Sequence, residues 1–153
     1  MKLLLTLIAF LGPLMVAAAD DQAVSAMAKA TGFTEQEIRE HGETGCDSGV
    51  QLHMTICALY HYYEKDVALN AAYQALMRRL QQPSAREELR KAQRAWLAYR
   101  DAQCRFDTSA WQGGTLRPML NANCLGAMTE ARTHQLKKTL ACKEAGCPQF
   151  KDE

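Results

Sequence analysis

Six cysteines constrain the fold of this chain more than any other feature of its sequence. They are Cys46, Cys57, Cys104, Cys124, Cys142 and Cys147. An even number of cysteines in a small exported protein is typical of a disulfide framework, and six cysteines allow 15 pairings. A zinc site is the competing interpretation, but the chain has no Cys-x-x-Cys pair to supply neighbouring thiolates. The cysteines therefore predict three disulfides in a protein that reaches an oxidising compartment.

The first 19 residues predict that export. Lys2 precedes an apolar run from Leu3 to Val16, and residues 17–19 are alanines of the kind found at signal-peptide cleavage sites. A retained membrane anchor is the alternative, against which Pro13 and the acidic residues 20–21 argue. We therefore expect a signal peptide over residues 1–19, a periplasmic or secreted mature protein, and no membrane contact after cleavage.

The size and charge of the mature chain limit its function. Removing the first 19 of 153 residues leaves 134, which is enough for one domain with its own core. The full chain has 18 Lys and Arg against 17 Asp and Glu, so the loss of Lys2 balances the two. Nucleic acid and anionic membranes are therefore not expected as partners, although residues 20–47 are locally acidic.

Apolar side chains recur with the helical period, and no segment alternates with the period of two that marks a strand. We expect helices over about residues 23–31, 35–42, 50–80, 85–107 and 118–142, and Asp66 leaves open whether the third is one helix or two. Capping boxes at Thr34 with Glu37 and at Ser84 with Glu87, and Pro118, mark three helix starts. The expected core positions are Leu52, Ile56, Leu59, Tyr63, Leu69, Tyr73, Leu76, Leu80, Leu89, Ala92, Trp96, Tyr99, Phe106, Leu125, Met128, Arg132, Leu136 and Leu140.

The predicted fold class is all-α, a small antiparallel bundle of three to four helices stapled by disulfides. Residues 20–45 form an acidic N-terminal segment of short helices that we expect to dock loosely, residues 46–142 the helical domain, and residues 143–153 a C-terminal tail. In such a bundle the local pairs Cys46–Cys57, Cys104–Cys124 and Cys142–Cys147 become neighbours. Each is expected to stabilise the domain by about 2–4 kcal/mol.

Two segments carry the candidate functional residues. In the segment from Leu89 to Phe106, a partly buried Arg100 requires an acidic partner, for which Asp66, Asp101 and Glu130 are candidates. The expected structural polar motif is Gln93, Trp96, Arg100 and Asp101, and a ligand or partner site on the same helix face is the alternative. In the bridged loop 108–117, the candidate partner-binding residues are Trp111, Gly113, Gly114 and Arg117. Alternatively, Trp111 simply covers the end of the bundle.

Catalysis and metal binding have little support. His53, Cys57 and His61 share one helix face, but Cys57 is better explained as half of a disulfide. No histidine or serine lies in a known nucleophile motif. We therefore expect no enzyme activity, no metal site and no cofactor.

The order of motifs resembles one known family. The sequence has Cys46, Cys57, Asp66-x-x-Leu69-Asn70-x-x-Tyr73-x-x-Leu76, Leu89-x-x-x-Gln93-x-x-Trp96-x-x-x-Arg100-Asp101-x-x-Cys104, Cys124 and Thr129-x-x-Arg132-x-x-x-Leu136. Over about residues 46 to 140 this is similar to the N-terminal domain of the lysozyme inhibitor LprI family of exported bacterial helical proteins.

This resemblance implies a binding protein that occludes the cleft of a lysozyme or another wall hydrolase. The chain differs from the named type because no lipidation cysteine follows the signal. The alternative hypothesis is an envelope interaction or immunity protein with a different protein partner. The sequence leaves the oligomeric state open.

Overall fold

The computed structural model describes residues 12–143 and 146–150, and side chains from residue 17 onward. Its elements are α1 (Gly12–Thr31), α2 (Glu35–His41), the short 3₁₀ helix η1 (Gly45–Asp47), α3 (Gln51–Arg79), α4 (Pro83–Asp107), the 3₁₀ helix η2 (Ser109–Trp111) and α5 (Arg117–Leu140). The described residues form no named strand, and a single bridge pairs Leu80 with Phe150. The fold is all-α, as the sequence predicts.

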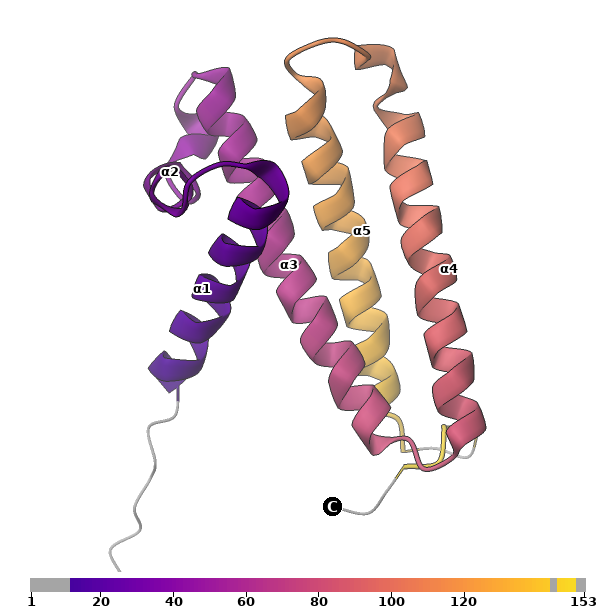
Figure 1. Ribbon diagram of the computed structural model, residues 1–153. Helices are drawn as coiled ribbons and strands as arrows, with labels where there is room; N and C mark the ends of the chain where they lie inside the picture. The colour runs from indigo at the N-terminus through magenta and orange to yellow at the C-terminus, as the bar shows by residue number, and fades with distance from the viewer. Residues whose placement is uncertain (1–11, 144–145, 151–153) are drawn as a thin grey trace, which may run out of the picture.

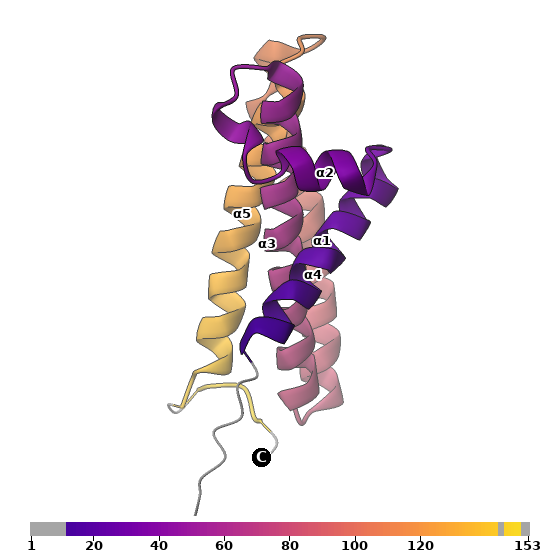
Figure 2. The same ribbon diagram turned by 90° about the vertical axis from the view of Figure 1, so that its left-hand side faces the viewer.

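The long helix α3 is the centre of the molecule. Helix α5 runs parallel to α3 along one side of it, start beside start, and α1 and α2 pack against its other side (Figures 1 and 2). Helix α4 completes a three-helix arrangement with α5 as its main neighbour (Figure 1). The helix α3 passes Asp66 without interruption, so this region is one helix and Asp66 is not an N-cap.

The core has two separate clusters of buried side chains. One lies between α1, α2 and α3 and contains Val24, Met27, Ile38, Ile56 and Tyr60. The other lies between α3 and α5, with α4 at its edge, and contains Leu69, Ala72, Leu76, Leu80 and Leu136. The side chains that join α5 to α3 most closely are small, since Ala122, Gly126, Thr129 and Thr133 are the other buried residues of α5.

The expectation of a loosely docked N-terminal segment is wrong. Val24, Met27 and Ile38 are almost completely buried, so α1 and α2 form an integral part of the first core cluster. The sequence contains few large apolar residues in this region, but nearly all of them face α3.

The predicted signal peptide stays a prediction, and its residues 1–11 lie outside the described part of the chain.

Helix starts follow the predicted signals in two of three cases. Thr34 and Glu37 form the predicted capping box at the start of α2, and the pKa of Glu37 is lowered because its carboxylate accepts hydrogen bonds from Thr34. Pro118 lies in the first turn of α5, where its missing N–H costs nothing. The capping box expected at Ser84 is wrong: the N-cap of α4 is Gln82, and Pro83 is the first helical residue.

The three disulfides of the structure are the local pairs expected from the sequence. Cys46–Cys57 joins η1 to α3, Cys104–Cys124 joins α4 to α5, and Cys142–Cys147 closes a small ring after α5, with Cα–Cα distances of 5.3, 5.6 and 5.8 Å. The second bridge fixes the end of the α4–α5 hairpin. It therefore holds both ends of the intervening loop in place.

Two buried glycines provide a matched stability test. A Cβ at Gly42 would lie 2.5 Å from the Ile38 carbonyl oxygen and 2.9 Å from the Tyr60 ring, whereas at Gly126 its nearest neighbour would be 3.6 Å away. We expect Gly42→Ala to lower the free energy of unfolding by about 1–3 kcal/mol. Gly126→Ala should raise it by about 0.5–1 kcal/mol, because alanine favours the helix interior. Urea unfolding of both variants checks the opposite signs, and equal effects would contradict the packing described here.

Candidate functional site

Arg100 is a buried charge at the junction of three helices. Its side chain is only 7% exposed and makes ion pairs with Asp101 at 2.9 Å and with Asp66 at 3.5 Å. Its Nη1 also donates to the Thr129 hydroxyl at 3.2 Å. Since Asp66 lies on α3 and Thr129 on α5, this one guanidinium connects α4 to both of its neighbours. Glu130, the third candidate partner, instead pairs with Lys65 at 2.9 Å.

Aromatic rings and a second arginine extend this junction. The Arg100 guanidinium lies 5.3 Å from the centre of the Trp96 ring and 5.5 Å from that of Tyr62. Burial raises the pKa of Tyr62 to about 12, with Arg100 opposing that shift. Arg132 lies over the same Trp96 ring at 5.8 Å and donates from Nε to the Gln93 amide oxygen at 3.1 Å.

These contacts bring most of the sequence motif into one place. We call the set the arginine network: Tyr62, Asp66, Gln93, Trp96, Arg100, Asp101, Thr129 and Arg132. Its members come from α3, α4 and α5: Arg100 pairs with both carboxylates, and Arg132 donates to the Gln93 amide beside Trp96. This arrangement positions helices, because its central cation is enclosed and already fully partnered.

The bridged loop between α4 and α5 has a defined shape. Thr108 is buried and donates to the carbonyl of Cys104, and the backbone N–H of Trp111 donates in turn to the carbonyl of Thr108 at 3.2 Å. Gly114 donates to the Trp111 carbonyl at 2.9 Å, and Gly113 has a positive φ of 79° that suits glycine. The loop is therefore ordered by its own hydrogen bonds as well as by the Cys104–Cys124 disulfide.

The side chain of Trp111 is 44% exposed and belongs to neither core cluster. Part of the ring is therefore in contact with solvent, and the alternative interpretation, that Trp111 covers the end of the bundle, stays a prediction. Arg117 is partly buried at the first position of α5, just after the loop. The structure thus places an exposed aromatic ring and an arginine at one end of the molecule (Figure 1).

Sequence reasoning assigned two exposed aromatic residues to the core. Tyr99 and Phe106 are 57% and 73% exposed. The bridged Cys104 marks the buried face of α4, and at 100° per residue Phe106 points about 200° away from it. This angle between Cys104 and Phe106 is the sequence signal that would have predicted an exposed Phe106. Leu52 and Ala92 were also expected in the core and are exposed.

The histidine pattern on α3 does not form a metal site with thiolate ligands. The sulfur atoms of Cys46 and Cys57 lie within 4.8 Å of a His61 nitrogen, but both belong to a disulfide. His53 instead stacks on His41 with ring centres 3.7 Å apart, and His61 contacts Glu64 at 2.8 Å.

None of the helices in the described part of the chain is both long and apolar enough to span a bilayer.

The fold and its junction define a small, disulfide-stapled helical domain with an exposed loop at one end. The family model described as "Lysozyme inhibitor LprI" matches residues 45–136, from the turn before Cys46 to Leu136 near the end of α5. The chain therefore belongs to this family. It is also 35% identical over 115 residues to an uncharacterised protein of Rhizobium meliloti (strain 1021), covering 67% of this chain and 83% of that protein. No solved structure matches the chain significantly.

The matched region contains the whole arginine network and the bridged loop, whereas α1 and α2 precede it. The family is named for inhibition rather than for catalysis. The three disulfides and the family together point to an extracellular or periplasmic protein with a protein partner.

Removing the central charge tests the role of the arginine network. We expect Arg100→Met to lower the free energy of unfolding by about 2–4 kcal/mol, because Asp66 and Asp101 would lose their shared cation. Arg94→Met on the same helix is the matched control, since Arg94 is exposed, and should change stability by less than about 0.5 kcal/mol. Chemical denaturation measures both variants, and equal small losses would show that the network is not needed for stability.

Proposed function

We propose that this protein is an exported bacterial inhibitor that binds a lysozyme-like wall hydrolase and blocks its substrate cleft. Membership in the lysozyme inhibitor LprI family is the observation that carries this proposal. It acts by binding alone, without catalysis or a cofactor, in the periplasm or outside the cell. Its three disulfides suit the oxidising conditions there.

The bridged loop is the surface that we propose enters the cleft. It projects from the end of the α4–α5 hairpin and presents Trp111 to solvent (Figure 1). Tryptophan and arginine are the residues that most often dominate binding energy in protein interfaces. The disulfide and the internal hydrogen bonds restrain the loop before binding, so that less conformational entropy is lost on association.

The chemistry of a glycoside hydrolase cleft suits such a loop. These enzymes hold two carboxyl groups on either side of the bond that they cleave. An indole ring can occupy a sugar-binding subsite, and the guanidinium of Arg117 can pair with a carboxylate of the hydrolase. The glycine pair Gly113 and Gly114 allows the backbone to approach the partner closely because it presents no side chains.

An acidic surface supports attraction to a basic hydrolase. Arg39 neutralises part of this surface through ion pairs with Asp21 at 2.8 Å and with Asp20 at 3.6 Å. The carboxylates of Glu43 and Asp47 remain exposed on the segment around η1. This segment adjoins the start of α3, which contacts the start of α5 through Gln51 and Met119, so it lies at the same end of the molecule as the loop.

Inhibition assays with loop variants test the proposal. The oxidised protein is titrated against an animal lysozyme and against bacterial wall hydrolases while cell-wall lysis is followed by turbidity. We expect inhibition of at least one enzyme. Trp111→Ala and Arg117→Ala should each weaken it by at least about thirty-fold, which corresponds to about 2 kcal/mol.

Matched controls are available on α4. Tyr99→Ala removes an exposed aromatic ring outside the loop, and Arg94→Ala removes an exposed arginine of the same helix. Both should leave inhibition unchanged. If all four variants inhibit equally well, the loop is not the contact. If the protein inhibits none of the enzymes, the proposal is wrong and an envelope partner other than a lysozyme becomes the better hypothesis.

A further inference from the structure

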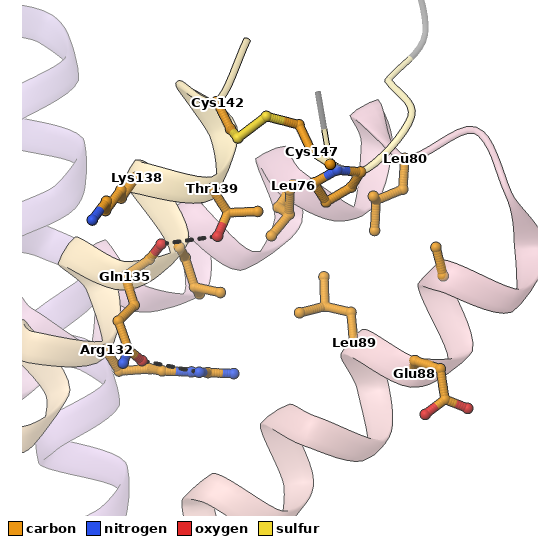
Figure 3. A pocket seen from close by; sticks show the side chains of 14 residues that line it. Leu76, Leu80, Glu88, Leu89, Arg132, Gln135, Lys138, Thr139, Cys142 and Cys147 are labelled. Carbon is orange, nitrogen blue, oxygen red and sulfur yellow. Dashed lines mark hydrogen bonds between the residues drawn. A yellow bond between two sulfur atoms is a disulfide. The ribbon is translucent and has the colours of Figure 1, made fainter. Parts of the chain in front are cut away.

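A cavity of about 700 Å³ lies at the opposite end of the molecule from the bridged loop. It is open to solvent and is lined by the end of α3, the start of α4 and the end of α5, and the Cys142–Cys147 ring borders it (Figure 3). Its volume is within the range of about 300–1,000 Å³ that is usual for small-molecule sites. Figure 1 shows α3 and α4 converging towards this end of the molecule, where residues 80–82 join them.

The walls of the cavity are mainly aliphatic. Leu76 and Leu80 approach from α3, Leu89 from α4 and Leu136 from α5 (Figure 3). These side chains belong to the second core cluster or pack against it, so the cavity is an opening into the apolar core. Leu76, Leu80 and Leu136 are only 2–3% exposed, so the partly buried Leu89 offers a larger share of the aliphatic surface that a ligand can reach.

Arg132 provides a positive charge at the edge of this apolar space. Figure 3 shows its side chain extending from α5 towards α4. Its Nε and Nη1 donate to the neutral amide oxygens of Gln93 and Gln135, both at 3.1 Å. Burial lowers the pKa of Arg132, and no carboxylate in the described part of the chain offsets this shift.

The other charged groups around the cavity leave this cation available. Glu88 also lines the cavity, but its carboxylate accepts a hydrogen bond from Lys91 at 3.0 Å. Lys138 contributes a second positive charge from α5. A half-buried arginine held by amides alone can gain a charge-assisted hydrogen bond from an anion.

We propose that this cavity binds an amphipathic anion, an aliphatic chain that ends in a carboxylate or a phosphate. The chain lies against Leu89 and over the edges of Leu76, Leu80 and Leu136, and the anionic group pairs with Arg132. This site is independent of the proposed hydrolase inhibition, because the bridged loop lies at the other end of the α4–α5 hairpin (Figure 1).

A fluorescent fatty acid is a suitable probe. Dansyl-labelled undecanoic acid is titrated into the oxidised protein below its micellar concentration, and the bound probe is then displaced with dodecanoate, dodecyl phosphate or dodecanol. We expect one saturable site. At least one of the two anions should compete about tenfold better than the neutral alcohol. The stronger anion shows whether the head group is carboxylate or phosphate.

Three substitutions separate the two parts of the site. Leu89→Gln places an amide in the apolar wall and should weaken every ligand by at least about tenfold. Arg132→Gln should weaken the anions by about tenfold and leave dodecanol unchanged, whereas Arg132→Lys keeps the charge and should retain most of the anion affinity. Lys137→Gln, an exposed position on the same helix, is the matched control and should bind as the unmodified protein does.

Several results would overturn the proposal. One is the absence of saturable binding to the unmodified protein, and another is unchanged binding in Leu89→Gln. Equal losses in Arg132→Gln and Arg132→Lys would show that Arg132 only supports Trp96 and does not bind the anion. Thermal unfolding of each variant confirms that the affinities compare folded proteins. The lysozyme assay does not enter this test, so the two proposals can fail separately.

Discussion

The positive charge of Arg100 has to be neutralised inside the protein, and this requirement fixes how three helices meet. A buried guanidinium without partners would cost several kcal/mol, so α4 must lie where Asp66 of α3 and Thr129 of α5 can reach it. Trp96 lies beside this cation and also beside Arg132. The register of α4 against its neighbours therefore depends more on these polar contacts than on the burial of apolar side chains.

This dependence explains the composition of α4. The buried residues of this helix are Gln93, Arg100 and Cys104, none of which is a large aliphatic side chain. A helix with so little apolar burial gains little from the hydrophobic effect and needs other constraints. The arginine network supplies one near the middle of the helix and the Cys104–Cys124 disulfide supplies another at its end. Because these two constraints hold α4 in place, Tyr99 and Phe106 can remain exposed to solvent.

The same arrangement gives the α4–α5 hairpin two distinct ends. At one end, the disulfide draws the helices together and presents a restrained loop with Trp111. At the other end, α4 starts at Pro83 away from α5, and the space between them opens into the aliphatic core beside Arg132. Most of the network lies between the loop and the cavity, and its member Arg132 also borders the cavity, where we propose that it binds the anion. The two proposed sites are therefore separately testable.

Local patterns in the sequence were sufficient for the helices, the α2 capping box, the local disulfide pairs and the family, because each depends on residues close together along the chain or on spacing within a motif. The packing of α1 on α3, the choice of Asp66 over Glu130 for Arg100, and the outward direction of Phe106 depended on how helices are rotated against one another. So did the cavity beside Arg132. Periodicity shows that a helix has an apolar face, but α4 is oriented by a buried charge and a disulfide, whose partners lie on other helices.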